Sequence, residues 1–263
     1  MLFAVYAFSG CASTGIVKKI TKMEGVSEQE IIDNLAVRVP FEEKKRFIYL
    51  MAWNRIPVGR IVAEIEGRTQ YKGREVFIVK LVTESNKFLS KIYRVEDTYI
   101  SYVDVETFTS RRYEADRKEG NYRKHVVVEY NFEKLEATYT NLTDGSVKTS
   151  SINKEVHDPL SAIYYFMTLP VVPEDKVKIT VNLNRKNYDV YGIVDSIEAV
   201  KLKNFGLIPA FKIKPYVELE NKQVRKGTAW LYCAADETRY PLYGVVKIPF
   251  GTVTATLVEV EDI

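Results

Sequence analysis

The chain has 263 residues, which is long enough for one large domain with a sizeable hydrophobic core. Its 38 Lys and Arg residues nearly balance its 35 Asp and Glu residues, so it lacks the basic excess of a nucleic-acid-binding protein. Two Cys and two His residues are too few for a disulfide scaffold, a multi-Cys zinc site or an iron–sulfur cluster built from this chain alone. Metal chemistry could therefore come only from carboxylates, and we expect no metal and no cofactor. The 18 Tyr and 12 Phe residues, with only 13 Gly and 9 Pro, favour sheet.

Residues 1–10 form an uncharged apolar run that is typical of the end of a secretory signal peptide. The next residue completes the segment Phe8-Ser9-Gly10-Cys11, which resembles a bacterial lipobox, in which the cysteine thiol receives diacylglycerol. We expect Cys11 to be lipidated, so that acyl chains hold the protein at a membrane surface. Ala12 resembles the default signal for sorting to the outer membrane. The alternative is that residues 2–8 form a buried strand and that Cys11 is a small core residue.

Residues 11–38 are polar and mixed, which indicates a tether leaving the membrane. Within them Ser27-Glu28-Gln29-Glu30 has the spacing of a capping box and predicts a short helix. No linker or change of composition divides residues 39–263, which we interpret as one domain.

From Val39 onward apolar and polar residues alternate with period two, which predicts about a dozen or more β-strands. Hairpin signals lie at Gln70-Tyr71-Lys72-Gly73, at Asp144-Gly145 and across Asn184–Asn187. The fold class is therefore all-β. So many strands must close, split into two layers or be plugged, so we expect a single large antiparallel curved sheet or barrel, or else a two-layer sandwich.

One helix, over about 158–168, interrupts this pattern. Asp158 is a good N-cap and Pro159 suits the first helical position. Leu160, Ile163, Tyr164 and Met167 share one face of this helix, which predicts that it plugs or covers the mouth of the sheet.

Tyr and Trp side chains suit either a wide core or an amphipathic ligand site, because each joins an apolar body to a polar tip. The candidates for either role are Trp53, Tyr93, Tyr99, Tyr102, Tyr164, Tyr165, Phe166 and Trp230. Asp236 and Arg239 lie at a predicted turn, where we expect an ion pair that ties a hairpin. We expect Arg111 and Arg112 on a solvated face, with contact to lipid phosphate or an acidic partner as the alternative.

His157 and Asp158 near Ser161 suggest a hydrolase, because a serine nucleophile needs an imidazole and a carboxylate. Neighbours at a helix start are poorly placed for this chemistry, and a capping role already explains Asp158. The sequence contains no GxSxG, P-loop or HExxH motif, and pairing of His125 with His157 on a metal is disfavoured. We expect no enzyme, and a hydrolase that uses His157 is the weakest alternative.

Several segments, taken in order, resemble the bacterial domain family of unknown function DUF3108. They are Pro40-Phe41, Phe47-x-Tyr49 with Trp53, Val58-Gly59, Tyr93-Arg94-Val95-Glu96-Asp97, Ser101-Tyr102-Val103-Asp104, Asp158-Pro159-Leu160-Ser161 with Tyr164-Tyr165 and Leu169-Pro170, Lys226-Gly227 with Trp230-Leu231, Asp236 with Arg239 and Pro241, and Ile248-Pro249-Phe250-Gly251-Thr252-Val253.

The resemblance implies a secreted or lipid-anchored envelope protein of mostly β structure, often an outer-membrane lipoprotein of Gram-negative bacteria, without an established activity. We therefore expect a non-catalytic lipoprotein anchored in the outer membrane and facing the periplasm, with a β domain that binds a lipid-like or amphipathic ligand. The alternative is a structural module that presents a sheet edge or loop to a partner in an envelope or polysaccharide-export complex. An apolar cavity would favour the first hypothesis, and a solid core with an exposed apolar patch would favour the second.

Overall fold

The computed structural model describes residues 17–19, 27–33, 44–224 and 228–263. The helices are α1 (Glu28–Asp33), α2 (Pro159–Thr168) and the short 3-10 helix η2 (Leu89–Lys91). The strands are β1 (Val17–Lys19), β2 (Lys45–Trp53), β3 (Ile56–Tyr71), β4 (Arg74–Ser85), β5 (Glu96–Asp104), β6 (Ser110–Glu119), β7 (Tyr122–Asn131), β8 (Glu136–Asn141), β9 (Val147–Ser151), β10 (Val156–His157), β11 (Lys176–Leu183), β12 (Lys186–Leu202), β13 (Gly206–Leu219), β14 (Lys222–Gln223), β15 (Ala229–Ala234), β16 (Pro241–Ile248) and β17 (Gly251–Asp262).

All of these strands belong to one 17-stranded sheet. From β2 to β9 each strand pairs antiparallel with the next, and β11, β12 and β13 form a second antiparallel run. The last strand, β17, pairs with β2, so strands from the two ends of the described domain lie side by side. The pairing of β10 with β11 is parallel.

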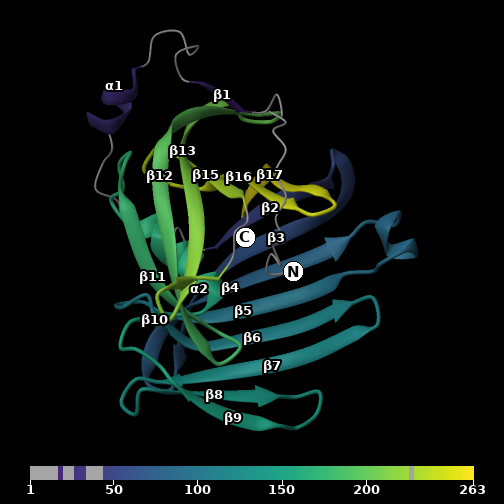
Figure 1. Ribbon diagram of the computed structural model, residues 1–263, viewed down its shortest axis with the longest axis vertical. Coiled ribbons are helices and arrows are strands. Elements are labelled where there is room, and N and C mark those ends of the chain that lie inside the picture. Colours follow the sequence, from purple (N-terminus) through teal and green to yellow (C-terminus); the bar gives the residue numbers. More distant parts are fainter. Residues whose placement is uncertain (1–16, 20–26, 34–43, 225–227) are drawn as a thin grey trace.

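The sheet curls around helix α2 without closing. Figure 1 shows β5–β9 crossing the lower half of the view, while β11–β13 rise steeply above them and α2 lies between. The strand order runs from β1 to β9, and within the described ranges these two outermost strands are not paired with each other. The prediction of an all-β fold built on one large curved sheet, with a helix packed against it, is confirmed. The sheet is an open barrel rather than a closed one or a two-layer sandwich, and its β10–β11 pair makes it mixed rather than purely antiparallel.

The predicted hairpins follow the local turn chemistry. Lys72 and Gly73 join β3 to β4 with φ of 49° and 77°, which is the left-handed backbone that a two-residue type I′ turn requires. Asn184 and Arg185 do the same between β11 and β12, with φ of 50° and 66°. The β8–β9 connection differs, because residues 142–146 form a longer loop in which Gly145 has φ of 73°.

A buried carboxylate fixes α2 to the inner face of the sheet. Asp158 is the N-cap, and its Oδ1 accepts hydrogen bonds from the backbone amides of Leu160 (2.7 Å) and Ser161 (2.9 Å). Its Oδ2 accepts from the hydroxyls of Ser101 on β5 and Ser110 on β6. Burial raises the pKa of Asp158, and the hydrogen bonds from the two serines oppose that shift. One side chain therefore caps the helix and ties it to two strands.

The segment expected to be a tether contributes to the described fold. β1 pairs antiparallel with β12, with Val17 opposite Val200. In α1 the backbone amide of Glu30 donates to Ser27 Oγ at 3.1 Å, as the capping-box spacing predicts. Ile31 is buried in a cluster with Val171 and other residues of the domain. Cys11 and the predicted signal-peptide remnant, residues 1–10, lie outside the described residues.

Candidate ligand-binding cavity

A cavity of about 560 Å³ lies between helix α2 and the inner face of the curved sheet. Strands β5–β8 line one side of it with Tyr99, Tyr113, Val126, Val128 and Tyr139. Alternation along the strands places these side chains on the inner face. The volume falls within the range of about 300 to 1,000 Å³ that is usual for sites of small organic ligands.

The opposite wall is a row of aliphatic side chains. Ile179 on β11 pairs with Val190 on β12, which in turn pairs with Val217 on β13. All three line the cavity. Directly paired residues of neighbouring strands point to the same face, so this row forms a continuous apolar surface.

Helix α2 lines the cavity with Ala162, Ile163, Phe166 and Met167, whose spacing places them along adjoining faces of the helix. Ile163 keeps 41% of its surface exposed, which is a large exposed fraction for an isoleucine beside a cavity. The Phe166 ring lies against Gly192 of β12, where an added Cβ would stand 2.9 Å from Phe166 Cε2. Glycine at this position therefore admits the ring between helix and sheet.

The polar groups around the cavity are few. Arg117 and Lys124 line it from β6 and β7, and Asn182 and Asn184 line it from the β11–β12 hairpin. Burial raises the pKa of Tyr113 well above its usual range, and its phenol is neutral at physiological pH, as that of an ordinary tyrosine is. The cavity is thus an apolar space with positive charge contributed by one pair of strands.

Two of the candidate aromatic residues, Tyr99 and Phe166, line this cavity, and the others lie elsewhere. Trp53 and Tyr93 are at the surface, with 38% and 46% of their area exposed, which differs from the expected core or ligand-lining role. The Trp53 indole donates to the Phe250 carbonyl at 3.0 Å, and Tyr93 packs against Gly120. Both rings cover turns rather than the interior.

The remaining candidates pack within the structure. Tyr164 belongs to the main core cluster, and Tyr102 points away from the cavity toward Tyr71, with ring centroids 4.9 Å apart. Tyr165 stacks on His157 at 4.6 Å, and Lys247 lies over the Trp230 ring at 5.4 Å. None of these four lines the cavity.

Sequence reasoning missed Tyr113, Tyr139, Tyr188 and Tyr191, which do line it. Period-two alternation along β6 shows that Tyr113, Ala115 and Arg117 share one face of the strand. The pattern does not show which face of the strand lies toward helix α2. The sequence alone therefore could not identify these tyrosines as cavity-lining residues.

The residues of the suggested hydrolase have structural roles. Ser161 Oγ lies 2.7 Å from Ser110 Oγ, and Asp158 is occupied by the capping and anchoring bonds. His157 stacks on Tyr165, and within the part of the chain that the structure describes no hydrogen bond joins it to Ser161 or Asp158. The arrangement is therefore a helix anchor, not a nucleophile with its base.

His157 predicts a pH dependence of stability. Burial lowers its pKa from 6.5 to about 4. The unfolded chain therefore takes up a proton as the pH falls below 6.5, while the folded chain stays neutral until about pH 4, so stability is lost across this window. We expect a loss of about 3 kcal/mol in the free energy of unfolding, measured by urea denaturation. His157→Phe, which keeps an aromatic ring next to Tyr165, should remove this part of the slope, and an unchanged slope would contradict the assignment.

Asp236 and Arg239 meet through the backbone. Asp236 Oδ1 accepts from the amides of Thr238 (2.8 Å) and Arg239 (3.3 Å), which stabilises the turn before β16. The Arg239 guanidinium lies over the Phe211 ring, 5.4 Å from its centroid. The described contacts of the two residues are therefore an Asp-capped turn and a cation–π contact, and the ion pair between them stays a prediction.

Arg111 is paired within the fold rather than solvated as expected. Its Nη2 lies 2.7 Å from Asp104 Oδ2, whose side chain is 1% exposed and also binds Arg74. Hydrogen bonds and ion pairing lower the pKa of Asp104 to about 2 against the opposing effect of burial.

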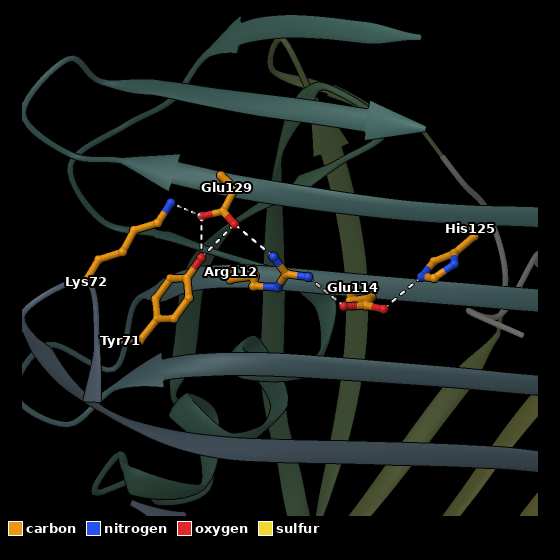
Figure 2. A network of polar contacts seen from close by, with 6 residues as sticks. All are labelled: Tyr71, Lys72, Arg112, Glu114, His125 and Glu129. Atoms are coloured by element: carbon orange, nitrogen blue, oxygen red, sulfur yellow. Dashed lines mark hydrogen bonds and ion pairs between the residues drawn. The ribbon is translucent and has the colours of Figure 1, made fainter. Parts of the chain in front are cut away.

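Arg112 belongs to a polar network on the outer face of the sheet, shown in Figure 2. The network comprises Tyr71, Lys72, Arg112, Glu114, His125 and Glu129. Arg112 bridges Glu129 at 3.0 Å and Glu114 at 2.8 Å, and only 25% of its side chain is exposed. Its ion pairs therefore connect β6 to β7, and the guanidinium does not lie on a solvated face as predicted.

The described part of the chain contains neither a candidate metal site nor a candidate membrane-spanning helix. Its His, Cys, Asp and Glu residues include no group of three or more that could hold a metal ion. None of the helices in this part combines the length and apolar character needed to cross a bilayer.

Fold and cavity together define a barrel-like all-β protein in which one open sheet curls around a helix and an apolar space. The sequence profile of DUF3108, a family described as of unknown function, matches residues 48–258, and the chain belongs to this family. The resemblance inferred from the sequence segments is thereby confirmed. Comparison with curated proteins gave no match.

A solved structure from another family supports the fold. A beta-barrel-like protein of the domain of unknown function DUF1849 from Brucella abortus has a TM-score of 0.57 at 9% identity, covering 83% of this chain and 97% of that one. A putative exported protein with a YmcC-like fold from Bacteroides fragilis has a TM-score of 0.32 at 10% identity, covering 85% and 98%. A putative lipoprotein from Parabacteroides distasonis has a TM-score of 0.36 at 8% identity, covering 84% and 97%. Because identities are this low, the likeness to the Brucella protein concerns the fold alone.

Proposed function

We propose that this protein binds a lipid-like or other amphipathic small molecule in the cavity beneath helix α2, and that it acts without catalysis. The observation that carries the proposal is the cavity of about 560 Å³ with its aromatic and aliphatic walls. The atoms that line an empty apolar cavity lack van der Waals contacts on one side. An apolar group bound in the cavity would supply these contacts and so would be stabilised there. The neutral state of the buried phenol of Tyr113 keeps that wall compatible with an alkyl chain.

The proposal places the protein at the bacterial cell envelope, anchored through acyl groups on Cys11. This part is supported by the lipobox-like segment that ends at Cys11 and by what DUF3108 membership implies. Mass spectrometry of the N-terminal peptide from membranes of the native host tests it. A diacylglycerol-modified Cys11 is the expected result, whereas a peptide that retains an unmodified Cys11 would refute the anchor.

Ligand binding is tested with a naphthylamine dye whose fluorescence rises in an apolar environment. We expect the dye to bind the protein with a one-site isotherm. Ile163→Glu should weaken this binding, because it introduces a charge beside the cavity at a residue that is 41% exposed and so tolerant of substitution. Leu142→Glu is the matched control, since Leu142 is 52% exposed on the β8–β9 loop and does not line the cavity.

The outcomes separate ligand binding from the alternative of an interaction module. If the dye fails to bind, or if both variants change its affinity equally, the cavity is not the binding site. Crosslinking to envelope proteins would then test the alternative, in which a sheet edge such as the exposed strand β9 pairs with a partner.

A further inference from the structure

Two positively charged residues face each other across β6 and β7 on the inner side of the sheet. Arg117 is the direct partner of Lys124 in the antiparallel register, and both line the cavity. Like charges that lie directly opposite on paired strands repel each other. The pair therefore concentrates positive charge on a wall that is otherwise apolar.

The two charges are compensated unequally. Arg117 forms an ion pair with Glu119, with Nη2 and Oε1 2.6 Å apart. Lys124 has no carboxylate partner among the residues that the structure describes, and its Nζ lies over the Tyr139 ring, 5.6 Å from the centroid. The nearby Tyr139 side chain raises the pKa of Lys124, and the amine is charged at neutral pH, as that of an ordinary lysine is.

The outer face of the same strands is organised differently. Lys118, the neighbour of Arg117 on β6, pairs with Asp116 at 2.7 Å. Arg112 on that face binds two carboxylates. The sequence thus supplies acidic partners for cations on the outer face, whereas the half-buried Lys124 faces an apolar cavity with an aromatic ring as its neighbour.

We infer that the cavity takes a single-chain amphiphile with an anionic headgroup, which pairs with Lys124 while the alkyl chain lies against the apolar walls. This inference rests on the proposed function and names the ligand class for the same site. Charge complementarity carries it, because an anion beside Lys124 would relieve the repulsion from Arg117 and satisfy the ammonium group. Carboxylate and phosphate monoester heads share this chemistry, and the experiment distinguishes them.

The test measures displacement of the naphthylamine dye by hexadecanoate, hexadecyl phosphate and hexadecanol, which share one alkyl chain, each below its micelle-forming concentration. For the wild-type protein we expect at least one of the anions to bind about tenfold more tightly than the alcohol, since a charge-assisted hydrogen bond is worth about one such factor. The preferred anion identifies the headgroup. Lys124→Gln should remove this preference by weakening the binding of the preferred anion about tenfold. Lys118→Gln is the control and should behave as the wild-type protein does.

Failure of this inference and failure of the proposed function give different results. If all three amphiphiles displace the dye equally from the wild-type protein, or if Lys124→Gln retains the preference, the cavity binds chains but Lys124 does not select the head. If none of the three displaces the dye, the cavity is not a site for amphiphiles, and both proposals are overturned.

Discussion

Asp158→Ala is expected to lower the free energy of unfolding by about 3 kcal/mol or more, because it leaves buried hydroxyl and amide donors without their acceptor. Those donors come from three elements, since Ser101 lies on β5, Ser110 on β6 and Leu160 in α2. Urea denaturation followed by circular dichroism measures the change. The same substitution should weaken dye binding, since α2 forms part of the cavity wall.

A conservative variant and a control make this prediction specific. Asp158→Asn preserves the shape and one acceptor, so its cost should be smaller than that of the alanine variant. Asp144→Ala removes an exposed carboxylate that bonds Ser146 in the β8–β9 loop, and should change stability by only about 0.5 kcal/mol. If Asp158→Ala cost no more than Asp144→Ala, the helix would not be held by this cluster.

Val190→Trp is expected to weaken binding of the dye and of any alkyl ligand by about tenfold or more, which corresponds to about 1.4 kcal/mol. Val190 lies in the middle of the aliphatic row on β11–β13, and the indole would occupy space that the ligand needs. Because an existing cavity receives the ring, the variant should fold with little loss of stability. Fluorescence titration and urea denaturation of the same samples measure the two quantities.

Val147→Trp is the matched control for this substitution. Val147 is 61% exposed on the edge strand β9 and does not line the cavity. Its dye affinity should equal that of the wild-type protein. Tight dye binding by a folded Val190→Trp protein would show that the dye occupies a different place.

The family segments gain a physical explanation from the structure. The segment Ser101-Tyr102-Val103-Asp104 supplies a hydroxyl to the helix cap and a buried carboxylate to Arg111. The segment that begins at Asp158 supplies the cap itself. The two segments are far apart along the chain, yet they meet at one buried cluster that holds α2 inside the sheet.

Local signals were sufficient for the parts of the fold that depend on neighbouring residues. Asp158-Pro159 predicted the start of α2, and Lys72-Gly73 predicted a hairpin turn, because caps and turns depend on the backbone of a few adjacent residues. The all-β class followed from period-two alternation. The pairing of β17 with β2 had no such signal, because it joins strands about two hundred residues apart.

The composition of the cavity was only partly predictable. Tyr99 and Phe166 were among the candidates, whereas Tyr113 was missed and Trp53 proved to be exposed. Aromatic content identifies residues that suit a core or a ligand site, but it does not assign the face of a strand that meets the helix. Arg112 similarly appeared solvated, because its partner Glu129 is brought beside it by the register of β6 and β7.

The sequence by itself therefore determined the all-β class, the capped helix, the tight turns and the family, since each depends on local backbone chemistry or on ordered segments. Only the tertiary structure decided that the sheet stays open and which side chains face the space beneath α2. It also decided that Lys124 lies opposite Arg117 without a carboxylate partner among the described residues. The physical reason is that register and curvature arise from contacts between distant strands, and a shift of one residue would turn every side chain to the other face.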